Sequence, residues 1–182
     1  MNLIETAPLW LLLVFCALLV AAAIEDVARL RVSNVTVLGV IATAAVAVAL
    51  AGPSLAIWQN LVVFVLLLGG GTLLFGMGKV GGGDVKLFAA AGLWTNLHEA
   101  LFLVSAVFIA GGILALIIIF PRLVSGRAGK RAARDRKKVV PYALAIAAGA
   151  LLVIAWQRSA DKARHPNPLE FRPVAGTPVQ RS

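Results

Sequence analysis

The sequence has little charge for its length. Only 14% of its 182 residues are charged, whereas 60% are hydrophobic. A soluble domain carries about 25% charged and about 45–50% apolar residues. From Val32 to Gly78 there is not one charged side chain, and because about 20 apolar residues cross the hydrocarbon core of a bilayer, this run holds two crossings. The composition therefore excludes a soluble globular domain and indicates a membrane protein.

Cysteine is almost absent as well. The single cysteine, Cys16, lies inside the first apolar run. No disulfide can form within the chain, and there is no Cys-x-x-Cys pair of the kind that binds zinc. We expect neither a metal ion nor another cofactor.

The apolar residues fall into six segments, which predict an all-α fold: a polytopic bundle of about six transmembrane helices. We place the segments near 7–24, 33–51, 55–77, 84–97, 100–120 and 139–156. Together they form a membrane-embedded domain over residues 1–156. The C-terminal residues 157–182 are rich in proline and polar side chains, and we expect them to form a disordered tail.

Most of the cations cluster between apolar segments, which argues against a nucleic-acid groove despite the net charge of +9. Eight Lys and Arg residues lie at 122–138, and the other membrane-proximal cations lie at Arg29, Arg31, Lys79 and Lys86. With six crossings these three loops share one face, which the positive-inside rule makes cytoplasmic. We expect the loop at 122–138 to bind anionic lipid headgroups. The basic tail favours a five-crossing alternative with the tail inside, and the number of crossings and the oligomeric state stay open.

A glycine-rich stretch, GMGKVGGGDVKL at 76–87, separates the third and fourth segments. It contains G-x-G-x-x-G but lies in no βαβ unit, and no Ser or Thr follows its first lysine, so both nucleotide-binding motifs fail. Asp84 either caps the following helix or serves a function. The glycines either let a loop open around a substrate or let helices pack closely.

Two adjacent carboxylates, Glu25 and Asp26, lie at the end of the first apolar helix, where the helix dipole opposes negative charge. The expected topology puts Asp26 and Asp84 on one membrane face. If the two helices pack together, the carboxyls can share one proton. One aspartate can then activate water while the other, protonated, polarises a carbonyl group, as in aspartyl proteases. Glu25 is expected to be a solvated neighbour, although an exchange of roles with Asp26 stays open.

These residues carry a family resemblance. GGGDVKLFAAAGLW at 81–94 resembles the GxGD region of type IV prepilin peptidases, which are aspartyl proteases of the bacterial inner membrane. EDVARLRVSN at 25–34 resembles their first motif, and VPYALAIAAGA at 140–150 resembles the start of their last helix. The chain's length and missing N-terminal extension look like the short branch that serves Flp-type (tight adherence) pili.

The resemblance implies that Asp26 and Asp84 are catalytic. It further implies a supporting role for the loop glycines and two nearby polar residues: Gly81, Gly82, Gly83, Lys86 and Asn34. The substrate would be a prepilin whose basic leader is cut at the cytoplasmic membrane surface. Ser33 stands where the family usually has proline. The chain also lacks the cysteine-rich domain of larger relatives, which puts their second activity, N-methylation, in doubt.

Two other functions stay open at this point. A small proton-coupled carrier could use the same aspartates as protonation sites, although carriers more often place such groups near the membrane midplane. The chain could also be a non-catalytic subunit of a pilus or secretion assembly, which is the third hypothesis after the peptidase and the carrier.

Overall fold

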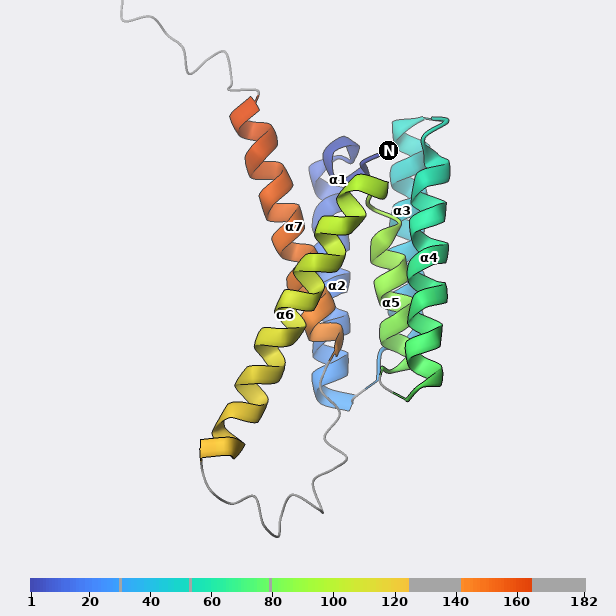
Figure 1. Ribbon diagram of the computed structural model, residues 1–182. Helices are drawn as coiled ribbons and strands as arrows, with labels where there is room; N and C mark the ends of the chain where they lie inside the picture. The colour runs from blue at the N-terminus through green and yellow to red at the C-terminus, as the bar shows by residue number, and fades with distance from the viewer. Residues whose placement is uncertain (30, 53, 79, 125–141, 165–182) are drawn as a thin grey trace, which may run out of the picture.

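The computed structural model describes the chain except residues 30, 53, 79, 125–141 and 165–182, and except the side chains of 118, 119, 121–124 and 161–164. Within the described part there are seven helices and no strand (Figure 1), so the predicted all-α fold is confirmed. The helices are α1 (Leu3–Thr6), α2 (Leu9–Arg29), α3 (Asn34–Ala51), α4 (Ile57–Gly76), α5 (Gly82–Gly92), α6 (Leu97–Val124) and α7 (Tyr142–Arg164).

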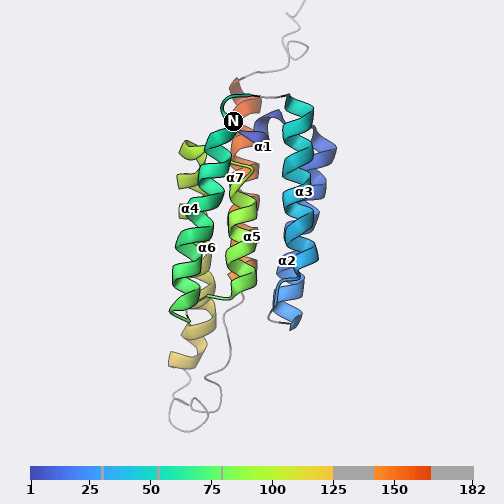
Figure 2. The same ribbon diagram turned by 90° about the vertical axis from the view of Figure 1, so that its right-hand side faces the viewer.

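From α2 to α7 the chain reverses direction at each connection, giving an upright bundle (Figures 1 and 2). Five helices are long and apolar enough to cross a membrane: α2, α3, α4, α6 and α7. The fourth expected segment, 84–97, forms α5, which has only 11 residues. At 1.5 Å per residue it is about 16 Å long, roughly half of the hydrocarbon thickness.

Three predicted boundaries are wrong. The segments expected at 84–97 and 100–120 leave His98 and Glu99 between helices, but these two residues lie in the first turn of α6, where the Asn96 side chain accepts a hydrogen bond from the Glu99 backbone N–H at 2.8 Å. Pro121 was expected to end this helix, which instead continues to Val124. The last helix runs on to Arg164 and so includes the first eight residues of the expected tail, while the remaining tail residues lie outside the described part.

The end of the bundle that holds the N-terminus is closed by polar side chains. The Asn60 amide donates to the backbone oxygens of Met1 at 2.9 Å and Leu93 at 2.8 Å. Gln157 of α7 donates to the Glu99 carboxylate at 2.6 Å. Since buried polar groups need such partners, the bonds of Asn60 tie α4 to the N-terminus and to the end of α5, and the bond of Gln157 ties α7 to α6, away from the glycine-rich loop.

The core contains both large aromatic side chains and small residues at close helix contacts. Trp94 is fully buried and stacks on Phe15 with ring centroids 4.2 Å apart. On the other side of the bundle, a Cβ built on Gly149 of α7 would lie 2.7 Å from the backbone nitrogen of Val107 in α6. Glycine therefore lets these two backbones approach, as small residues do between membrane helices.

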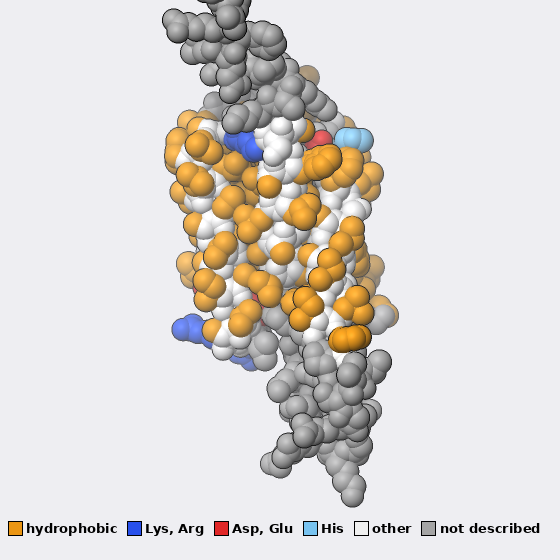
Figure 3. All heavy atoms as spheres, turned by 90° about the vertical axis from the view of Figure 1, so that its left-hand side faces the viewer, with side chains coloured by type: hydrophobic (Ala, Val, Ile, Leu, Met, Phe, Trp, Pro, Cys, Tyr) orange, Lys and Arg blue, Asp and Glu red, His pale blue; other side chains and the backbone are white. Residues whose placement is uncertain are grey.

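The outer surface is apolar around the middle of the bundle, while the charged side chains visible in Figure 3 lie toward its two ends. Three of the four tryptophans are more than half exposed: Trp10 at 56%, Trp58 at 56% and Trp156 at 70%. Two of them lie where α2 and α4 begin and the third near the end of α7, so all three lie toward the N-terminal end of the bundle (Figure 1). Exposed tryptophans at one level are typical of a membrane interface.

Candidate active site

Asp26 lies in the penultimate turn of α2 and is 97% buried, with a relative exposure of 3%. Its Oδ2 accepts a hydrogen bond of 2.9 Å from the backbone N–H of Ala143, in the first turn of α7. The first amides of a helix have no partner within the helix, and its dipole favours negative charge there. The unfavourable position at the end of α2 is thus offset by a favourable one at the start of α7.

Asp84 lies in the first turn of α5, on the fourth residue counted from the N-cap Gly81. It is therefore not the N-cap itself, which was the simplest structural role expected for it. Its side chain is turned back toward Gly81, so that a Cβ on that glycine would lie 2.7 Å from Oδ2. Any larger residue at this position would displace the carboxyl group.

The two aspartates, 58 positions apart in the sequence, act on one another electrostatically. Burial raises the pKa of Asp84 most, the charge of Asp26 raises it further, and the backbone N–H of Gly81 opposes both, leaving the pKa at about 7. Asp84 lies outside the five helices that are long enough to span the membrane. A carboxyl group with this pKa holds a proton for about half of the time near neutral pH.

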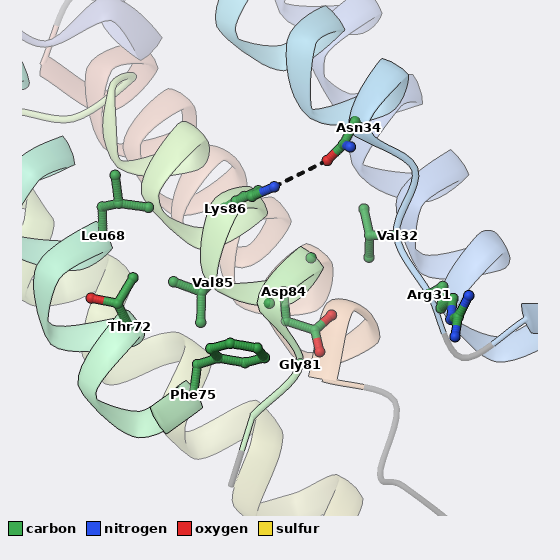
Figure 4. A pocket seen from close by; sticks show the side chains of 12 residues that line it. Arg31, Val32, Asn34, Leu68, Thr72, Phe75, Gly81, Asp84, Val85 and Lys86 are labelled. Carbon is green, nitrogen blue, oxygen red and sulfur yellow. Dashed lines mark hydrogen bonds between the residues drawn. The ribbon is translucent and has the colours of Figure 1, made fainter. Parts of the chain in front are cut away.

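A cavity of about 610 Å³ opens beside Asp84, between the start of α3 and the facing sides of α4 and α5 (Figure 4). Its wall is mixed. Apolar side chains come from α4 and α5, and two cations, Arg31 and Lys86, lie on the wall with the glycines. The lining residues are Arg31, Val32, Asn34, Leu68, Thr72, Phe75, Gly81, Gly82, Gly83, Asp84, Val85 and Lys86.

The five residues to which the sequence assigned a supporting role all line this cavity: Gly81, Gly82, Gly83, Lys86 and Asn34. The Lys86 ammonium donates to Oδ1 of Asn34 at 3.3 Å, bridging α5 and α3 across the cavity (Figure 4). A Cβ on Gly82 would lie 3.3 Å from the Phe75 ring, and one on Gly83 would lie 3.2 Å from the backbone oxygen of Val32. Close packing accounts for these two glycines. Lys79 and most of the basic loop at 122–138 lie outside the described residues.

Glu25 was expected to be a solvated neighbour of Asp26; it is half-buried, and it has hydrogen-bond partners that the sequence did not predict. Its carboxylate accepts hydrogen bonds from the backbone N–H of Ser33 at 2.9 Å and from the hydroxyl of Thr36 at 3.0 Å. Glu25 thus holds the start of α3, while the Ser33 hydroxyl accepts from the backbone N–H of Val35 at 3.2 Å. Because proline has no N–H, a proline at position 33 could not make the bond to Glu25. Ser33, which stands where the family usually has proline, and Glu25 are therefore linked by one hydrogen bond at the start of α3.

Sequence reasoning missed two parts of the site. The contact of Asp26 with Ala143 joins residues 117 positions apart, and although the sequence predicts a helix start near Tyr142, nothing in it pairs that start with Asp26. The role of Glu25 had a signal in Ser33, which can act as N-cap. Within the described residues, no three His, Cys, Asp or Glu side chains are grouped so as to hold a metal ion.

Comparison with known proteins adds one finding. The model of the type IV leader peptidase family matches residues 13–116, more than half of the chain. The match includes Asp26, Asp84 and the glycine-rich stretch, and it ends before α7. No curated protein and no solved structure matches significantly. From the family match we conclude that this multi-pass membrane chain belongs to the type IV leader peptidase family.

Proposed function

We propose that the chain is an intramembrane aspartic endopeptidase that removes the basic leader from Flp-type type IV prepilins. In this proposal Asp26 and Asp84 are the catalytic pair, and the site faces the cytoplasm from the bacterial inner membrane. Family membership supports peptidase activity on prepilins. The observation that carries the rest is the pair of buried carboxyl groups from α2 and α5, of which one raises the pKa of the other.

The environments of the two carboxyls favour different roles. The hydrogen bond from Ala143 and the start of α7 stabilise a carboxylate at Asp26. Asp84 accordingly holds the shared proton. Asp26 takes a proton from water, the water oxygen attacks the scissile carbonyl carbon, and Asp84 gives its proton to the carbonyl oxygen.

The tetrahedral intermediate then collapses. Asp26 passes its new proton to the amide nitrogen as the C–N bond breaks, and Asp84 takes back a proton from one hydroxyl as the carbonyl re-forms. The pair again holds one proton, and the products are a carboxylic acid and an amine. No group outside the two aspartates and water is needed to balance the reaction.

The position of the aspartates also bears on the alternatives. Both lie at the end of the bundle opposite the polar network around Asn60, and not at its middle (Figure 1). This fits cleavage at a membrane surface better than ion transport through the midplane.

The test is co-expression with a Flp-type prepilin and separation of precursor and mature pilin on a gel. Asp26→Asn and Asp84→Asn should each leave the precursor uncut. Glu99→Gln, a carboxylate at the far end of the bundle, should process it normally. Processing by either aspartate variant would refute the catalytic pair, whereas cleavage of a non-Flp prepilin in preference to the Flp-type one would refute the assignment to the Flp branch.

A further inference from the structure

A second cavity, of about 660 Å³, adjoins Asp84 from the other side of α5. It lies between α4 and α6, with α5 and α7 behind it, and nearly all of its wall is apolar. Its lining residues are Leu66, Leu67, Gly70, Gly71, Leu73, Leu74, Val80, Asp84, Val85, Phe88, Val104, Val107, Phe108, Gly111, Gly112, Tyr142, Ala145 and Ile146. We call it the α4–α6 groove.

The shape of the bundle explains the groove. Figure 1 shows that α6 diverges from α4 toward the end at which α5 begins. The groove follows α4 from Leu66 to Leu74 and α6 from Val104 to Gly112, which is about 12 Å, or roughly two turns of a helix. Glycines on both walls keep it open. A Cβ built on Gly70 of α4 or on Gly112 of α6 would meet no atom within 4 Å.

The groove and the cavity with Lys86 share only Asp84 and Val85. One is apolar and runs along the membrane-spanning helices α4 and α6, and the other carries the polar and cationic side chains. A protein segment that changes from polar to apolar would match this pair of cavities, with the peptide bond at the change next to Asp84. An apolar helix gains little from leaving lipid for another apolar surface, so its fit must come from close packing against small residues. Gly70 and Gly112 offer such a surface.

The geometry points to the α4–α6 groove as the docking site for the apolar helix of the protein substrate, which enters between α4 and α6 and presents its polar end to Asp84. This inference rests on the proposed function and adds the place where the substrate is held. Gly70 and Gly112 are then specificity-determining positions, since side chains added there occupy space that the substrate helix needs.

Three matched variants test the steric part of the inference. Gly70→Leu and Gly112→Leu fill the groove, whereas Gly69→Leu is a control on α4, because Gly69 also has free space around a Cβ but does not line the groove. Leucine is a better helix former than glycine, so all three proteins should fold. We expect the groove variants to process prepilin about tenfold more slowly or worse, since excluding one apolar side chain from a packed site has an effect of this order, while the control retains the rate.

Chemical cross-linking identifies the occupant. Cys16 is the only cysteine, so a Cys16→Ser, Asp84→Asn protein provides a background that has no thiol and leaves the substrate uncut. Gly70→Cys or Gly112→Cys in this background should join, through a short bismaleimide, to a cysteine placed in the apolar helix of the prepilin. Gly69→Cys should give little adduct.

The outcomes separate the inference from the function on which it rests. Wild-type rates in both groove variants, with Asp84→Asn inactive, would overturn the docking site but leave the peptidase intact. Loss of rate in Gly69→Leu as well would also overturn it. If the wild type cut no prepilin, the proposed function would fall, and the cross-link would still decide: absence of adduct from both cysteines means that lipid or another molecule fills the groove.

Discussion

The contact between Asp26 and Ala143 allows the structural and the chemical role of one aspartate to be separated. Asp26→Asn keeps a side-chain oxygen that can accept from the Ala143 N–H, but it cannot accept a proton from water. Asp26→Ala removes both. We expect both variants to lose leader cleavage, and we expect only the alanine variant to lose substantial stability.

The expected loss of stability in Asp26→Ala follows from the burial of the hydrogen bond between Asp26 and Ala143. Leaving the Ala143 N–H buried without a partner costs about 1–3 kcal/mol, and losing a negative group at the start of α7 costs about 0.3–1 kcal/mol more. Asp26→Ala should therefore lose about 1–4 kcal/mol in the free energy of unfolding. For a chain of this size each kcal/mol lowers the unfolding temperature by about 2–4 °C. The asparagine variant loses only the charge, and it should unfold within a few degrees of the wild type.

The assay pairs thermal unfolding in detergent micelles with prepilin cleavage by the same preparation. The reasoning predicts a stable, inactive asparagine variant and a less stable, inactive alanine variant. Equal stability of the wild type and the alanine variant would show that Asp26 does not support α7. An asparagine variant that still cleaves would show that the residue acts only as a structural acceptor.

Three further predictions concern pH, packing and the start of α3. Because the pKa of Asp84 is raised from 3.8 to about 7, the folded protein holds a proton that the unfolded chain releases, so the free energy of unfolding should fall as pH rises from about 4 to about 7 and then level off. Cleavage needs that proton, so the cleavage rate should decline above about pH 7. An unchanged rate at pH 9 would contradict the proton-sharing pair. Gly149→Leu places a side chain against the backbone of Val107 and should lower stability by several kcal/mol through overpacking, so an unfolding temperature equal to that of the wild type would count against the close approach of α6 and α7. Ser33→Pro removes the N–H that binds Glu25 and should cost about 1–3 kcal/mol. Glu25→Ala also loses the bond from Thr36 and should cost more, and the double variant should lose little beyond Glu25→Ala, because the contact with Ser33 is then already broken.

The sequence was sufficient for the helical class, for the order of the six segments and for the location of Asp26 and Asp84 toward the same end of the bundle. Long apolar runs predict membrane helices well because every backbone group in lipid must bond within its own helix. The number of full crossings was harder, since the segment at 84–97 is largely apolar but shorter than the about 20 residues that a crossing needs, and its helix ends at Gly92. There the chain turns through Trp94, whose ring packs on Phe15 of a distant helix.

Predictions at charged residues next to apolar runs were incomplete or wrong for a related reason. Glu99 is a charged residue next to an apolar run, which normally indicates a loop, but Gln157 from α7 gives it a partner. Glu25 likewise has partners in Ser33 and Thr36. A sequence pattern registers the charge and not the distant donor that makes its position favourable.

The exposed tryptophans provide a reference level for the position of Asp26 along the bundle. If the level of Trp10 marks one boundary of the bilayer, Asp26 follows sixteen residues later on the same helix, which is about 24 Å further along the axis. With a hydrocarbon layer of about 30 Å, the carboxyl group then lies within one helical turn or so of the opposite boundary. At that depth a water molecule has only a short way to travel from the bulk, whereas a peptide bond held in the middle of its own membrane helix would be out of reach. The distance between Trp10 and Asp26 along α2 would thereby restrict hydrolysis to peptide bonds near the surface of the bilayer.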